Sequence, residues 1–228
     1  MSNAPGLHRF VARRTTSLPV RFAERAPRPL GEFCEMCGLD VSDEHSHVVD
    51  IDSRRLLCTC RPCALLFTAT GASRGHYRAV PERYLTDPQL HLSAEHWEQL
   101  QVPVAIAFFF HNSVVDRIVA HYPSPAGATE SLLDLSAWEA VWADNLLVAA
   151  MLPDIEALVV RRDRAGRHEC YLIPIDACYE LVGKVRMHWS GFDGGAEVKA
   201  DLDAFFDRVR DRAQVVTAED IETAGTRG

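Results

Sequence analysis

The sequence predicts an α+β fold, in which a small cysteine-rich module precedes a larger domain with antiparallel hairpins and three or more helices. Five of the seven cysteines lie between residues 34 and 63, in paired spacing. Downstream, short apolar runs bounded by turn residues indicate strands. Other segments repeat apolar residues every three to four positions, which is typical of amphipathic helices.

Length and charge limit the function. The 228 residues allow one domain of ordinary size and a small module. The net charge of −8 disfavours nucleic acid, because proteins that bind phosphates usually carry the opposite balance. The longest apolar run covers residues 102–110, whereas a membrane-spanning helix needs about 20 residues. We therefore expect no nucleic-acid partner and no membrane span.

The chain divides into five predicted segments. They are a flexible basic tail (1–32), the cysteine module (33–70), a connector (71–92), the α+β domain (93–213) and a disordered tail (214–228). The first segment holds six arginines against two glutamates, so it could meet an acidic partner. No apolar segment follows its charges, and the number of cysteines is odd. Both observations favour a cytoplasmic location over secretion.

The elements of the module and connector follow from short apolar runs and turn residues. We expect a hairpin of residues 47–52 and 55–59 that turns at Ser53, a helix that starts at Ala64, and a strand at 76–80.

The first half of the larger domain begins with a short helix and a hairpin. We expect the helix at 93–101, a buried strand at 102–110, its partner at 117–122 and a turn at 124–127 within a plain loop. Three consecutive phenylalanines, 108 to 110, alternate between the faces of the strand. They predict either a second packed layer or a patch for a partner.

Helices frame a second hairpin in the rest of the domain. Ser136 and Glu139 have the spacing of a capping box, so a helix is expected to run from there through Ala149 until Pro153. The remaining elements are expected to be a hairpin of 155–162 and 168–175, a helix capped by Asp176, a break at 191–195 and a last helix from Ala196.

The spacing of Cys34, Cys37, Cys60 and Cys63 indicates a metal site. A Cys-x-x-Cys turn points both sulfurs inward, and two such turns supply four tetrahedral ligands. Gly38 can adopt the left-handed conformation that closes the first turn. The second pair precedes the expected helix, whose dipole favours thiolate.

Knuckle, hairpin, knuckle and helix follow the order of a treble-clef or zinc-ribbon-like module. Zinc is therefore the expected metal, and iron is the alternative because two cysteine knuckles also hold iron in rubredoxin.

The module offers more candidate ligands than one ion needs. We take the two Cys-x-x-Cys pairs as ligands and Cys58 as a small core residue, because unpaired cysteine is commonly buried. Alternatively, Cys58 serves a second site or an iron–sulfur cluster. His45 and His47 are expected in a polar loop that leads into a strand, and either could replace one cysteine as a ligand.

Cys178 is a second candidate for chemistry. It lies two residues after Asp176, in the expected first turn of a helix, where its pKa would fall. With His168 or His188 as base, it could serve a cysteine-dependent enzyme as nucleophile. The simpler interpretation is a packed helix residue.

Several motifs together resemble one family. They are Cys34-x-x-Cys37, residues 57–67 (LCTCRPCALLF), 107–110 (AFFF), 122–131 (YPSPAGATES) and 189–195 (WSGFDGG). They are similar to motifs of an uncharacterised bacterial family, a domain of unknown function encoded beside high-affinity nickel–iron hydrogenases. The similarity covers nearly all of residues 30–213. It implies a hydrogenase accessory role, in maturation or in electron transfer, and it implies no catalytic residues.

Differences from the rubredoxin sequence pattern indicate which metal the cysteines bind. Rubredoxin-like accessory proteins also occur in hydrogenase gene sets, which keeps iron as an alternative. In this chain Pro62 precedes the last cysteine of the cluster, and Ala64 stands where rubredoxins carry a glycine. Both departures favour zinc.

The sequence is compatible with three functions. The first is a non-enzymatic metal-binding accessory protein, which acts in hydrogenase maturation or assembly by contacting a nickel–iron hydrogenase subunit or a maturation factor. The second is a rubredoxin-like or iron–sulfur electron carrier that serves a hydrogenase. The third is a cysteine-dependent enzyme that uses Cys178.

Overall fold

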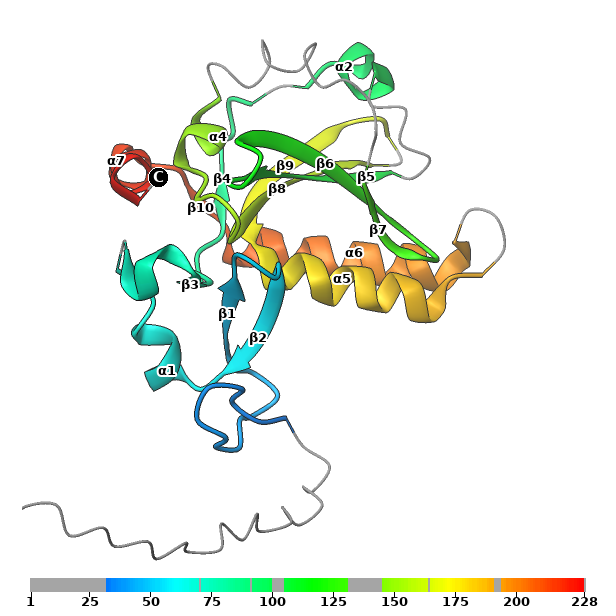
Figure 1. Ribbon diagram of the computed structural model, residues 1–228. Helices are drawn as coiled ribbons and strands as arrows, with labels where there is room; N and C mark the ends of the chain where they lie inside the picture. Colours follow the sequence, from blue (N-terminus) through cyan, green and yellow to red (C-terminus); the bar gives the residue numbers. More distant parts are fainter. Residues whose placement is uncertain are drawn as a thin grey trace, which may run out of the picture. The chain divides into compact units, whose positions relative to one another are not determined.

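The computed structural model describes residues 32–69, 71–90, 92–99, 105–130, 145–163, 165–190 and 194–227. These residues form two β-sheets with helices, which confirms the mixed α+β fold (Figure 1). Apart from Glu32, the predicted basic tail lies outside the described residues. Within the described ranges, no helix has the length and apolar character needed to cross a membrane.

The smaller sheet contains the predicted hairpin. Its order is β2-β1-β3 and its pairs are antiparallel, with β1 at Ser46–Asp50, β2 at Arg55–Thr59 and β3 at Tyr77–Ala79. A 3-10 turn, η2 (Ala72–Gly75), precedes β3. The third strand comes from the predicted connector and completes the sheet of the cysteine module.

Helix α1 (Arg61–Leu65) follows β2 directly. It begins three residues before the predicted start at Ala64, because Cys60 is its N-cap and Pro62 lies in its first turn. Proline is tolerated there, since the first helical N–H groups have no partner within the helix.

The larger sheet has seven strands in the order β10-β4-β9-β8-β5-β6-β7. All neighbouring pairs are antiparallel except the short β4 and β10. The strands are β4 (Leu85–Thr86), β5 (Ile106–Asn112), β6 (Arg117–Ser124), β7 (Gly127–Glu130), β8 (Glu156–Arg162), β9 (His168–Pro174) and β10 (Gln214–Val215).

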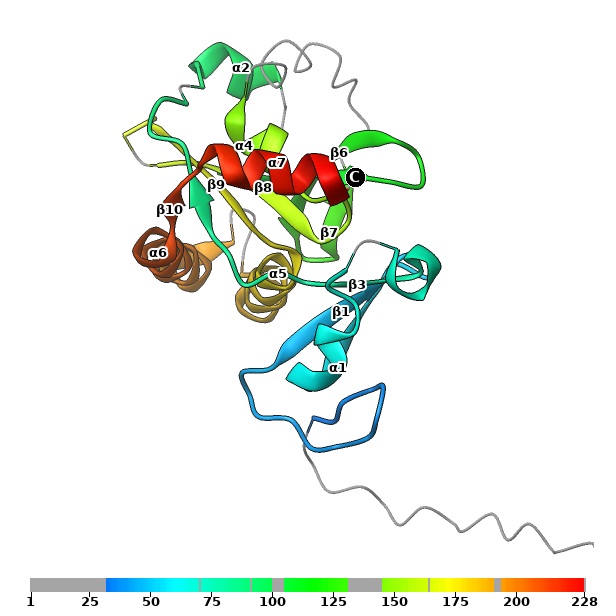
Figure 2. The same cartoon turned by 90° about the vertical axis from the view of Figure 1, so that its left-hand side faces the viewer.

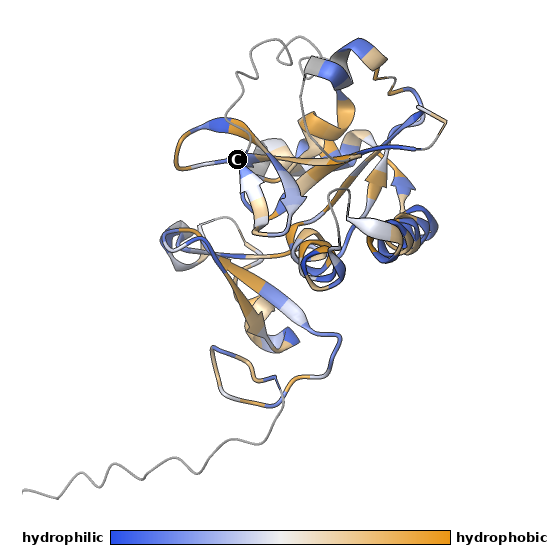
Figure 3. Ribbon diagram, turned by 90° about the vertical axis from the view of Figure 1, so that its right-hand side faces the viewer, coloured by the Kyte–Doolittle hydropathy of each residue, from blue (hydrophilic) through white to orange (hydrophobic). Residues whose placement is uncertain are grey.

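Helices cover both faces of this sheet (Figures 1 and 2). One face packs against α5 (Ile175–His188) and α6 (Gly195–Arg212), and the other against α2 (Ala94–Gln99), α4 (Leu146–Ala150) and α7 (Ala218–Arg227). Phe108 is buried on the first face and Phe109 on the second, so the phenylalanine run serves two packed layers. The central strands are mostly hydrophobic, as expected for strands covered on both sides (Figure 3).

The predicted helix over residues 136–149 is wrong in its last part. Asn145 has extended backbone angles, and its side-chain oxygen accepts hydrogen bonds from the N–H groups of Leu147 and Val148 at 2.9 and 3.2 Å. It is therefore the N-cap of a separate short helix, α4, and no helix passes through it. The expected start at Ser136 lies outside the described residues.

We expect Asn145→Ala to lower the free energy of unfolding by about 1 kcal/mol, which is typical for the loss of an N-cap. Asn145 is buried, so the two N–H groups would find no water in its place. Urea denaturation of the two proteins measures the change. Asn145→Ser keeps an oxygen acceptor and should retain part of the stability, whereas equal stability of wild type and Asn145→Ala would contradict the cap.

Four other expectations need correction. Residues 127–130 form β7 rather than part of a plain loop, because they pair with the end of β6. Residues 214–227 are not disordered, since they form β10 and α7. Asp176 is the second residue of α5 and does not cap it, because Pro174 holds that position. The strand predicted at 102–110 is β5, which continues to Asn112, and residues 102–104 lie outside the described part.

Candidate metal centre

The first cysteine pair lies on a tight loop before β1. The N–H of Gly38 donates to the carbonyl of Cys34 at 2.7 Å, and the N–H of Cys34 donates to the carbonyl of Leu39 at 2.8 Å. Gly38 has a φ of 79°, which other residues adopt at a cost. These bonds fold the loop back on itself, as predicted for the first knuckle.

The second pair joins β2 to α1. Cys60 has an extended backbone and precedes the helix, while Cys63 lies in its first turn. The N–H of Ala64 donates to the carbonyl of Cys60 at 3.0 Å, which turns the chain sharply between the two cysteines. Each pair is thus positioned by local backbone bonds around its own loop.

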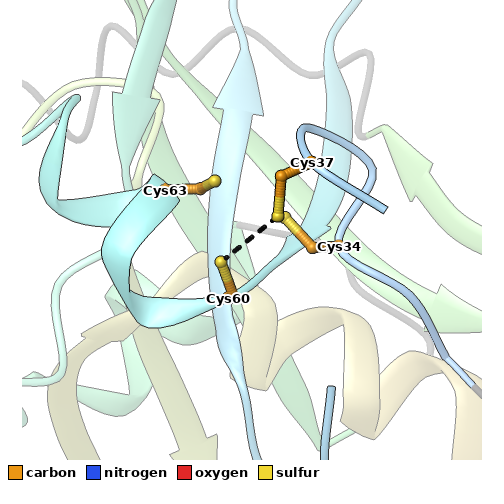
Figure 4. Close-up of side chains that lie close together, drawn as sticks. All are labelled: Cys34, Cys37, Cys60 and Cys63. Carbon is orange, nitrogen blue, oxygen red and sulfur yellow. Dashed lines mark hydrogen bonds between the residues drawn. The ribbon is translucent and has the colours of Figure 1, made fainter. Parts of the chain in front are cut away.

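The hairpin brings the two loops together (Figure 4). All four sulfur atoms lie within 4.8 Å of one another, and the Sγ atoms of Cys37 and Cys60 are 3.7 Å apart. A tetrahedral zinc ion with Zn–S bonds of about 2.3 Å requires sulfurs about 3.8 Å apart. The cluster is therefore close to the size that a four-thiolate metal site needs, and it fits zinc or iron.

The sulfurs differ in how readily they ionise. Burial opposes the charge on Cys34, but backbone N–H groups of Cys60, Cys37 and Met36 donate to its sulfur and lower its pKa to about 6. Hydrogen bonding to Cys60, followed by burial and the other thiols, raises the pKa of Cys63 to about 12. The first thiolate thus makes ionisation of its neighbours costly, and a bound cation would remove that cost.

Cys58, His45 and His47 do not join the four-sulfur cluster. They form a separate group, whose ligand atoms also lie within 4.8 Å of one another. The side chain of His45 is buried, while His47 and Cys58 are partly buried. Cys58 is therefore partly exposed, and it does not belong to the buried core in which the simpler sequence interpretation places it.

The structure does not support Cys178 as a nucleophile. The side chain is buried, and burial raises the pKa of its thiol rather than lowering it. His168 bonds through Nδ1 to the carbonyl of Leu92 and lies beside the ring of Trp97, which belongs to the other core layer from Cys178. His188 pairs with Asp201. Cys178 belongs to the apolar layer between the large sheet and α5, as the simpler interpretation holds.

Sequence reasoning missed a cavity of about 530 Å³, lined by residues of both sheets and α5. Cys178, His121, Arg55 and Arg117 are among its lining residues. Burial lowers the pKa of His121, and its Nδ1 is buried without a hydrogen-bond partner. These residues come from three separate elements, β2, β6 and α5, and share no motif, so no pattern in the sequence could have grouped them.

The fold and the site define a mixed α+β protein whose module before the large sheet carries a four-cysteine cluster, able to bind a metal ion such as zinc or iron. The chain belongs to a family of unknown function, DUF5947, which matches residues 33–213. No curated protein and no solved structure matches the chain.

Proposed function

We propose that the protein is a non-enzymatic accessory protein whose four-cysteine cluster holds a structural zinc ion and shapes a surface for a protein partner. The closed set of four sulfurs is the observation that carries this proposal. Four protein ligands fill a tetrahedral ion and leave no position for a substrate, which is typical of structural sites.

We propose zinc rather than iron because the residues around the second knuckle differ from those of rubredoxin. Pro62 before the last cysteine and Ala64 after it depart from the rubredoxin pattern. Iron in the same four sulfurs would instead make the protein an electron carrier for a hydrogenase. Metal analysis by mass spectrometry and a visible spectrum of anaerobically purified protein separate the two. We expect tightly held zinc and no colour, whereas iron with thiolate charge-transfer bands would overturn the structural role.

Exposed apolar side chains beside the cluster support a protein partner. Leu39, Leu65 and Leu66 are 63%, 56% and 67% exposed, and each lies within three residues of a cluster cysteine. Large exposed apolar side chains are common at protein–protein contact sites. We call these three leucines the knuckle leucines.

The kind of partner is proposed from the resemblance of the sequence motifs to the family encoded beside nickel–iron hydrogenases. We propose a nickel–iron hydrogenase subunit or a hydrogenase maturation factor as the partner. The basic segment 1–32 would add contacts to an acidic surface of that partner. A cytoplasmic location is part of the same proposal, because maturation factors act before a hydrogenase is complete.

Partner capture tests the proposal. We expect the tagged full-length protein to retain a hydrogenase subunit or maturation factor from its own cells, and Leu65→Glu/Leu66→Glu to reduce that capture at least tenfold, since charge is depleted at the centre of such contacts. Met187→Glu is the matched control, because Met187 is 73% exposed on α5. Capture of no hydrogenase component, or equal capture by wild type and the double variant, would refute it.

A further inference from the structure

His45, His47 and Cys58 meet on one face of the β1–β2 hairpin. His47 and Cys58 are directly paired across β1 and β2, and His45 lies one residue before β1 begins. Their ligand atoms lie within 4.8 Å of one another, and the two imidazole rings have centroids 4.6 Å apart. The four cluster cysteines are not members of this group.

One ring nitrogen of His45 is buried without a partner. Its Nδ1 lies 2.8 Å from the carbonyl oxygen of Ser42 and 3.4 Å from a carboxylate oxygen of Glu32. Both oxygens are acceptors, so in the neutral tautomer that fits them Nδ1 carries the proton and Nε2 carries the lone pair. Nε2 is buried without a hydrogen-bond partner, and the side chain is only 6% exposed. A buried acceptor without a partner is costly, and a metal ion would satisfy it.

His47 is oriented in the same manner. Its Nδ1 lies 2.9 Å from the Oδ2 atom of Asp176, in the first turn of α5. The carboxylate accepts the Nδ1 proton, so in the neutral ring Nε2 carries the lone pair. A carboxylate behind a histidine is the usual support of a metal-binding imidazole, because it fixes the ring and makes it more basic.

The backbone at Cys58 is also held in place. Its N–H donates to the Oε2 atom of Glu35 at 2.9 Å, and its carbonyl accepts from the N–H of Glu35 at 2.8 Å. The thiol is therefore presented from a strand that is bonded on both sides, to β1 and to the first knuckle loop.

We propose that His45, His47 and Cys58 form a second metal site, separate from the four-cysteine cluster, for a late first-row divalent ion of the zinc type. Two imidazole nitrogens and one sulfur suit ions of intermediate softness. A tetrahedral ion needs nitrogen ligands about 3.4 Å apart at Zn–N bonds of about 2.05 Å, so modest side-chain rotations close the site. Three protein ligands leave one position open for water or for a group of a partner.

Metal stoichiometry of the full-length protein tests the site. After loading with excess zinc chloride and gel filtration, mass spectrometry should find about two zinc ions per chain in the wild type. His47→Ala and Cys58→Ser should each retain about one. His76→Ala is the matched control, because His76 also pairs through Nδ1 with an aspartate, Asp52, but belongs to neither group. It should keep both ions.

Cobalt spectra assign the second ion. The second equivalent of cobalt(II) added to the wild type should give a thiolate charge-transfer band that Cys58→Ser lacks, while the stronger band of the first equivalent remains. Asp176→Asn should keep the second ion but weaken its binding by about 10- to 100-fold, as expected for a supporting carboxylate.

Two results would overturn this inference. Wild-type protein that saturates at one ion has no second site. A Cys58→Ser protein that keeps the circular dichroism spectrum of the wild type but loses both ions would make Cys58 a ligand of the four-cysteine cluster instead.

Discussion

Cys60→Ser is expected to release the ion of the four-cysteine cluster and to unfold both knuckles, while the seven-stranded sheet stays folded. The buried hydrophobic side chains of the cysteine module are few, and include Cys34, Val48, Leu57 and Ala64. Structural zinc contributes about 10–16 kcal/mol in zinc-finger peptides. A whole domain is typically stable by only about 5–15 kcal/mol. With a metal ion bound, we therefore expect the module to depend on that ion more than on its apolar contacts.

Hydrogen exchange measures this loss locally. The N–H groups of Gly38 and Ala64, which close the two knuckles, should exchange at least 100-fold faster in Cys60→Ser than in the wild type. The amides of β8 and β9 should keep their protection. Cys58→Ser is the matched control, because it removes a thiol two residues away on the same chain segment and should leave both knuckles protected. Unchanged protection and tightly held metal in Cys60→Ser would show that Cys60 is not a ligand.

Arg83→Ala is expected to lower the free energy of unfolding by about 3–5 kcal/mol, the usual cost of leaving a buried charge without its partner. Arg83 bonds to both carboxylate oxygens of Glu156, at 2.7 and 2.9 Å, and Glu156 is fully buried. The same guanidinium donates to the carbonyl of Ala150 and to Asp220 of α7. One side chain thus ties α4, β8 and α7 together.

Two further variants separate the charge from the packing. Asp220→Asn removes a partly exposed contact of Arg83 and should cost less than 1 kcal/mol. Arg83→Met/Glu156→Leu replaces both charges by apolar groups and should recover most of the loss of Arg83→Ala. Urea denaturation of all four proteins gives the comparison. An Arg83→Ala protein within 1 kcal/mol of the wild type would contradict the expected cost of breaking this buried ion pair.

Local patterns predicted the elements whose stability is local. The hairpin of β8 and β9 follows from two apolar runs and a turn with Gly166 at a φ of 79°. The knuckles follow from the Cys-x-x-Cys spacing and from Gly38. In each case the residues that make the structure are neighbours in the chain, so their order alone is informative.

Elements that depend on distant partners were missed. Strands β4 and β10 have two residues each and exist because they pair with each other and, for β4, with β9. Helix α7 is anchored by Asp220, whose partner Arg83 lies 137 residues earlier. The helix predicted through Asn145 was wrong because apolar spacing alone does not reveal that the asparagine bonds to the backbone ahead of it.

The four-cysteine cluster on a knuckle–hairpin–knuckle–helix module could be predicted from the sequence, because ligand spacing and turn geometry are set within a few residues. Only the tertiary structure shows which side chains that are distant in the sequence lie close together. It separated His45, His47 and Cys58 from the cluster, and it placed Asp176 behind His47 from 129 residues away. Such contacts arise when strands pair and helices pack on them, since packing brings together residues that no local spacing relates.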